Sequence, residues 1–134
     1  MAGYSSRPLW QKLGLKAGQT AVCLNSPPDY RQMLGELPPR ITFSDTLPPV
    51  ADFIHLFTVS LVELEAVLPQ LKATLAKDGM LWISWPKKAA KIATDLDGNV
   101  VRELGLTAGL VDVKVAAVDE VWSGLKFVYR VLDR

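Results

Sequence analysis

The chain has 134 residues and a mass of 14.7 kDa, and this size predicts a single domain over residues 1–134. Apolar residues make up 49% of it and charged residues 22%, which excludes a disordered chain, and a net charge of +1 argues against a dedicated nucleic-acid reader. One cysteine and one histidine exclude an internal disulfide and give too few ligands for a conventional zinc cluster, so no metal is expected. Residues 1–7 are polar and no apolar run approaches about 18 residues, so a cytoplasmic protein without a membrane segment is expected.

The first half of the chain alternates short helices and strands that are separated by proline pairs. The apolar run at residues 20–24 predicts a buried strand, and it stops before Pro27 and Pro28 because consecutive prolines cannot continue a β-ladder. Helical spacing of apolar residues predicts a short helix over residues 30–37. The other elements expected here are a helix at 6–14 and strands at 41–43 and 51–57.

The second half begins with a well-marked helix and ends with two strands. Ser60 and Glu63 match a capping box, and Pro69 inside the following helical pattern predicts a kink or a split. Thr94 and Asp97 are candidate caps of a second helix. Strands are expected at residues 80–85, 111–118 and 125–131, the last two joined as an antiparallel hairpin. This order of elements indicates an α/β fold with right-handed crossovers around a mostly parallel sheet.

Several stretches of the chain resemble the core of class I S-adenosylmethionine-dependent methyltransferases, which have a Rossmann-like fold. The likeness extends over residues 13–131 and is carried by residues 15–22, 51–56, 71–84 and 108–113. The whole chain also resembles a bacterial family of small domains of unknown function, through residues 85–89 and 119–127. That second resemblance implies no established activity.

The methyltransferase resemblance implies a three-layer sandwich with a shortened sheet. Only a short proline loop separates the expected strands at 41–43 and 51–57, which leaves no room for the helix, strand and helix of the full-length family. We therefore expect about six strands in the order 2-1-3-4-6-5, with the last strand antiparallel between strands 4 and 5. Ligands of open α/β sheets bind where the strand order reverses, which places the site between strands 1 and 3.

The sequence departs from the methyltransferase pattern at the turn where that family binds its cofactor. The family has a glycine-rich turn, whereas residues 24–29 contain Pro27 and Pro28 and no glycine, so two amide donors are missing. This favours a domain that has lost catalysis and has no cofactor. The alternative is a methyltransferase with a divergent turn, in which Asn25, Ser26 and Asp45 hold S-adenosylmethionine. Asp45 follows the second expected strand, where the family places an acid on the ribose, but a solvated loop aspartate is the favoured explanation.

Charged and aromatic residues follow the carboxyl ends of the later strands and form a candidate rim. Two lysines, two carboxylates and two indoles could bind a planar or anionic ligand, and the alternative is solvated lysines with tryptophans packed on the core. The candidate rim residues are Trp85, Lys87, Lys88, Asp119, Glu120 and Trp122.

The leading hypothesis is a non-catalytic methyltransferase-like domain that binds a small anionic molecule or a protein partner through this rim. A second alternative is a structural homo-oligomer that uses the edge at residues 41–43. The single histidine, His55, lies in an apolar strand without a second ligand or an acid at triad spacing. We therefore expect a hydrogen-bonded core residue at this position.

Overall fold

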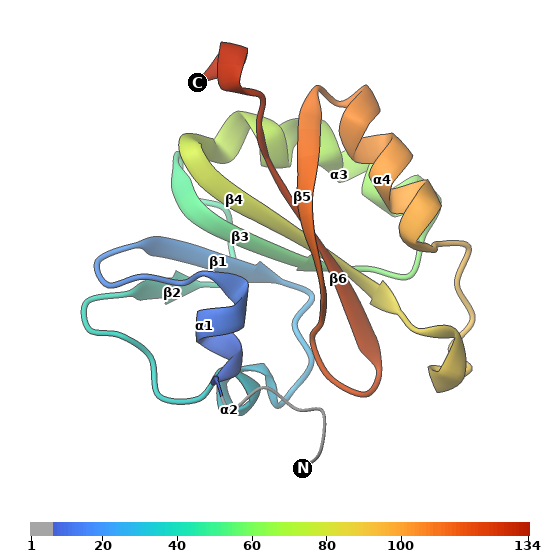
Figure 1. Cartoon of the computed structure of the whole chain (residues 1–134), viewed down its shortest axis with the longest axis horizontal. Coiled ribbons are helices and arrows are strands. Elements are labelled where there is room, and N and C mark those ends of the chain that lie inside the picture. The colour runs from blue at the N-terminus through green and yellow to red at the C-terminus, as the bar shows by residue number, and fades with distance from the viewer. Residues whose placement is uncertain (1–6) are drawn as a thin grey trace.

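One six-stranded sheet organises residues 7–134, the part of the chain that the computed structural model describes (Figure 1). The strand order is β2-β1-β3-β4-β6-β5, as the sequence predicts. Strands β2, β1, β3 and β4 are parallel, whereas β6 is antiparallel to both β4 and β5. The strands are β1 (Thr20–Leu24), β2 (Thr42–Ser44), β3 (Ala51–Phe57), β4 (Leu75–Pro86), β5 (Leu110–Ala117) and β6 (Trp122–Tyr129).

Four α-helices cover the sheet, and the two longer ones begin at side-chain caps. Ser60 Oγ accepts a hydrogen bond from the Glu63 amide at 3.1 Å, and Asp97 Oδ1 accepts one from the Val100 amide at 2.9 Å. The expected start of the first helix at Ser6 lies outside the described residues. Among residues 7–134, no helix combines the length and the apolar character needed to cross a membrane. The helices are α1 (Leu9–Leu13), α2 (Tyr30–Leu34), α3 (Leu61–Thr74) and α4 (Gly98–Thr107), with 3-10 turns at η1 (Lys88–Ala90) and η2 (Val131–Asp133).

The two faces of the sheet carry separate cores, so the fold is a three-layer Rossmann-like sandwich. Helices α3 and α4 pack on one face through an apolar cluster that includes Leu64, Leu71 and Val101. Helices α1 and α2 pack on the other face through a cluster that includes Leu13 and Leu34 (Figure 1). Side chains alternate along each strand, which is how one sheet supplies both cores.

Helix α3 and strand β4 refine the sequence prediction. Helix α3 has no split at Pro69, because buried leucines on both sides of the proline hold it on the sheet, and the alternative of a kink stays a prediction. Strand β4 begins at Leu75 instead of residue 80, and its pairing with β3 is irregular at that end. Gly79 permits this irregularity, since a Cβ atom there would lie 2.7 Å from the carbonyl oxygen of Asp52.

Candidate functional site

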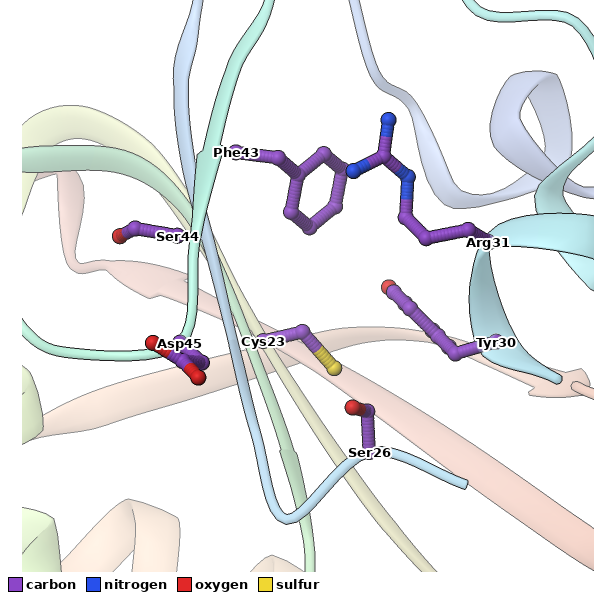
Figure 2. A pocket seen from close by; sticks show the side chains of 7 residues that line it. All are labelled: Cys23, Ser26, Tyr30, Arg31, Phe43, Ser44 and Asp45. Atoms are coloured by element: carbon purple, nitrogen blue, oxygen red, sulfur yellow. The ribbon is translucent and has the colours of Figure 1, made fainter. Parts of the chain in front are cut away.

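A pocket of about 270 Å³ opens at the carboxyl ends of β1 and β2. These strands are parallel neighbours, so the residues that follow them meet at the same edge of the sheet. Ser26 follows β1 and Asp45 follows β2, and both line the pocket (Figure 2). The complete lining consists of Cys23, Ser26, Tyr30, Arg31, Phe43, Ser44 and Asp45.

The chain turns sharply after β1 although the turn has no glycine. Asn25 adopts a left-handed conformation with φ of 57°, which asparagine tolerates better than most residues. Its side-chain amide donates to the carbonyl oxygen of Phe57 and to Glu63 Oε1, both at 3.2 Å. Asparagine thus allows the chain to turn sharply here without a glycine. Pro27 and Pro28 still lack amide hydrogens, so side chains must provide much of the polar character of this site.

The lining of the pocket combines two aromatic rings with two charged side chains, Arg31 and Asp45. Figure 2 shows the Arg31 side chain beside the ring of Phe43, and its guanidinium carbon lies 4.9 Å from the ring centroid. The side chains of Cys23 and Ser26 point toward each other in the same view, and the Tyr30 ring lies beside them. Burial raises the pKa of the Cys23 thiol to about 12, so this sulfur is protonated at neutral pH and is a poor nucleophile. Asp45 is exposed at the mouth of the pocket.

A buried chain of hydrogen bonds connects the pocket to the centre of the sheet. The Tyr30 hydroxyl lies 2.9 Å from His55 Nδ1, and His55 Nε2 lies 2.7 Å from Ser84 Oγ. His55 also stacks on Phe57, with 4.2 Å between ring centroids. Burial lowers the pKa of His55 to about 3, so the ring is neutral and one of its nitrogens donates while the other accepts. The expected hydrogen-bonded core histidine is confirmed, and it fixes the hydroxyl of Tyr30 behind the pocket.

Three of the six candidate rim residues line a second pocket, of about 520 Å³. Lys87 Nζ donates to the carbonyl oxygen of Asp119 at 2.6 Å. Asp119 Oδ1 accepts from the amides of Val121 and Trp122 at 2.8 and 2.7 Å, so Asp119 also closes the hairpin between β5 and β6. Glu120 is exposed beside them. The lining of this pocket is Lys12, Asp29, Met33, Lys87, Ala117, Val118, Asp119, Glu120 and Val121.

The other three rim residues lie elsewhere. Trp85 is buried in the apolar cluster beneath α3 and α4, on the opposite face of the sheet from the second pocket. Trp122 packs edge-on against Phe57 at 5.1 Å between centroids. Lys88 begins the exposed turn η1. Of the alternative cofactor residues, Ser26 and Asp45 line the first pocket, whereas Asn25 only shapes the turn beside it.

Sequence reasoning missed five residues of the first pocket, namely Cys23, Tyr30, Arg31, Phe43 and Ser44. One of these, Tyr30, could have been found. Tyr30 and His55 both occupy positions that the apolar pattern predicts to be buried, and a buried polar group requires a partner. Pairing them would have placed the start of α2 against β3. The other four depend on how β1, β2 and α2 meet in space, which residue spacing does not reveal.

The chain superposes on solved structures of several methyltransferases, whereas no family model and no curated protein sequence matches it. An S-adenosylmethionine-dependent methyltransferase from Aquifex aeolicus superposes with a TM-score of 0.57 at 18% identity, over 87% of this chain and 85% of its own. The magnesium protoporphyrin IX methyltransferase of Synechocystis PCC 6803, with bound S-adenosylhomocysteine, superposes with a TM-score of 0.58 at 12% identity. The match covers 91% of this chain and 78% of that protein. An O-methyltransferase from neocarzinostatin biosynthesis, with bound S-adenosylmethionine, superposes with a TM-score of 0.63 at 13% identity. The match covers 96% of this chain and 51% of that protein.

These likenesses show that the chain has a shortened methyltransferase-type fold. They also correct one expectation from the sequence, the absence of a cofactor, because structures of the same fold hold S-adenosylmethionine or S-adenosylhomocysteine. The expectation of no cofactor depended on the missing glycine and on the two amide donors missing at Pro27 and Pro28, whereas Asn25 shows that the chain turns here without a glycine. Within residues 7–134 there is no group of three or more histidine, cysteine, aspartate or glutamate side chains placed to hold a metal ion.

Proposed function

We propose that the chain is an S-adenosylmethionine-dependent methyltransferase domain with a divergent cofactor turn, and that the pocket at β1 and β2 receives the adenosyl part of the cofactor. One observation carries this proposal. The pocket brings Ser26, which follows β1, together with Asp45, which follows β2, on a methyltransferase-type sheet. These are two of the three residues that the alternative interpretation of the sequence selected.

The donors and acceptors of the pocket suit a ribose. The Asp45 carboxylate accepts hydrogen bonds, so it complements the two hydroxyl donors of an adenosyl ribose. The Ser26 hydroxyl both donates and accepts, which compensates in part for the amides missing at Pro27 and Pro28. A volume of about 270 Å³ is slightly below the ~300–1,000 Å³ of complete small-molecule pockets, which suits a site that encloses part of the ligand.

The remaining pocket residues orient the ligand rather than react with it. Arg31 places a cation beside the pocket, which complements a carboxylate at the amino-acid end of the ligand. Cys23 and Tyr30 are uncharged at neutral pH because burial raises the pKa of both groups. S-adenosylmethionine supplies, when bound, an electrophilic methyl group on a sulfonium.

Calorimetric titration with S-adenosylmethionine and S-adenosylhomocysteine tests the proposal directly. We expect micromolar binding of both by the wild-type chain. Asp45→Asn keeps the side-chain volume and removes the charge, so it should weaken binding by at least ~10-fold, the usual effect of losing a hydrogen bond to a charged group. Asp78→Asn is the matched control, because Asp78 is exposed in the segment that leads into Gly79, away from the pocket.

Two outcomes would contradict this assignment in different ways. Absence of binding by the wild-type chain at millimolar ligand would reject the proposed function itself. Wild-type binding that Asp45→Asn and Asp78→Asn leave equally strong would keep the cofactor and reject this pocket as its site.

A further inference from the structure

Two lysines face each other across the last pair of strands. Lys114 of β5 is paired with Lys126 of β6 in the antiparallel ladder. Like charges at directly opposed positions destabilise a sheet, because their side chains are close neighbours on one face. Both side chains reach α1: Lys114 Nζ donates to the carbonyl oxygen of Lys12 at 3.1 Å, and Lys126 Nζ lies 3.8 Å from the position of a Cβ atom at Gly14.

Helix α1 and the loop after it add two more lysines to this pair. Lys12 Nζ donates to the carbonyl oxygen of Ala117 at 3.2 Å, and Lys16 is exposed just beyond the helix. We call Lys12, Lys16, Lys114 and Lys126 the lysine patch. Burial and the charges of Lys114 and Lys16 lower the pKa of Lys126, so the repulsion is felt at that ammonium group. No lysine of the patch forms a salt bridge with a carboxylate of the described residues, although Asp29, Asp119 and Glu120 line the second pocket together with Lys12.

The carbonyl groups at the end of α1 do not account for four cations. Trp82 Nε1 donates to the Leu13 carbonyl oxygen at 2.8 Å, and the amides of Gly14 and Leu15 occupy the carbonyls of Gln11 and Trp10. Lys114 satisfies the carbonyl of Lys12. All four final carbonyls of the helix therefore have partners, and Lys16 and Lys126 are in excess of what the helix end requires. A cost in stability that nothing inside the fold offsets is typical of a functional surface.

We propose that the lysine patch binds the phosphate backbone of a nucleic acid. Ammonium groups act as point charges toward phosphates, and the patch consists of lysines alone. The four lysines come from α1, the loop after α1 and two strands, and only Lys12 of them lines the second pocket. Because the lysines are spread over the surface instead of gathered in one pocket, they suit an extended polyanion better than a small anion. This proposal goes beyond the methyltransferase function and does not depend on it.

We favour a nucleic acid over a membrane because membrane binding is strengthened by exposed apolar side chains that enter the bilayer beside the cations. The exposed Val115 is adjacent to Lys114 along β5, so it projects from the opposite face of the strand. Val113 is a single exposed valine beside Lys114, in the irregular stretch of β5. Trp10 and Leu13 of α1 are directed largely into the core of the domain instead.

The salt dependence of binding to a fluorescent oligouridine measures the number of phosphates contacted. At low salt we expect a dissociation constant of ~10⁻⁴ to 10⁻⁶ M, the range of binding through phosphates alone. With up to four contacts on a single strand, the slope of log K against log salt should be about −3. The double variant Lys114→Gln with Lys126→Gln should reduce the magnitude of that slope by ~1.4, or ~0.7 for each lysine.

The control is a second double variant, Lys88→Gln with Lys91→Gln. It also removes two positive charges, but from lysines that lie close together in the sequence and outside the lysine patch. We expect it to leave the slope unchanged. The proposal is overturned if the wild-type chain does not bind oligouridine at low salt, or if the two double variants reduce the slope equally. Binding to vesicles that contain phosphatidylserine but not to oligouridine overturns it in favour of a membrane, and competition by millimolar inorganic phosphate alone overturns it in favour of a small anion.

Discussion

The two faces of the sheet differ in the length and capping of the helices that cover them. The face under α3 and α4 has helices of 14 and 10 residues, each with a side-chain cap, and an apolar core. The face under α1 and α2 has two five-residue helices that begin without a side-chain capping bond among residues 7–134. Both pockets at the carboxyl edge are lined by residues of this second face. The long, capped helices thus lie on one face, and the two pockets described above lie on the other.

Helices of five residues are unstable alone, so single contacts must hold α1 and α2 in place. The Trp82 indole donates to the Leu13 carbonyl oxygen at the end of α1, and the Tyr30 hydroxyl anchors the start of α2 to His55. Such elements open more readily than long packed helices. A binding site bounded by α2 can therefore adjust to a ligand while the α3 and α4 face stays intact.

Gly105→Ala should have the largest effect, because it disrupts the packed face. A Cβ atom at Gly105 would lie 2.0 Å from Phe127 Cε1, and both residues are buried between α4 and the sheet. Helix α4 must then move away from β6, and we expect the free energy of unfolding to fall by about 3 kcal/mol, the upper range for overpacked cores. Urea denaturation followed by circular dichroism measures this change.

Gly98→Ala in the same helix is the control for the effect of alanine alone. Its Cβ atom would make an ordinary contact with Trp85 at 3.5 Å, so the substitution should be neutral or stabilise by up to about 1 kcal/mol. Equal stability of the two variants would show that α4 is not seated as closely on Phe127 as the structure indicates.

On the α1 and α2 face, the buried His55 should make the free energy of unfolding depend on pH. Burial lowers the pKa of His55 to about 3 in the folded chain, against about 6.5 when unfolded. Between these values the unfolded chain binds the extra proton, so the free energy of unfolding falls as pH falls. From pH 7 to pH 5 the expected loss is about 2 kcal/mol, measured by urea denaturation at each pH.

His55→Gln separates this titration from that of other groups, since His55 is the only histidine of the chain. The variant loses stability at neutral pH because the bonds to Tyr30 and Ser84 are altered, but its stability should change little between pH 7 and pH 5. A pH dependence that survives in His55→Gln would assign the effect to carboxylates instead.

Local patterns predicted most of the elements, because apolar runs, proline pairs and caps mark where they begin and end. The order of the strands came instead from the resemblance to methyltransferases, and it is confirmed. Ser26 and Asp45 were selected as alternative cofactor residues because they follow strands, and both line the first pocket. The conformation of Asn25 was not predictable in this way, since asparagine only tolerates the left-handed region and does not require it. The Tyr30 to Ser84 chain and the pairing of Lys114 with Lys126 depend on strand register, which a one-residue shift would change completely.

The smallest predicted effect is an increase in the free energy of unfolding. It tests whether the opposed lysines beside α1 destabilise the fold. Lys126→Gln removes one charge from the opposed lysine pair, so it should raise the free energy of unfolding by about 0.5 kcal/mol at low salt. The gain is small because Lys126 is only half-buried and water screens the repulsion. In 1 M salt, where screening acts within about 3 Å, the gain should disappear. Lys91→Gln is the control: Lys91 follows the exposed turn η1, so its replacement should leave stability unchanged at both salt concentrations. A gain for Lys126→Gln that persists in 1 M salt would attribute the effect to packing beside Gly14 and remove the electrostatic cost from which the lysine patch was inferred.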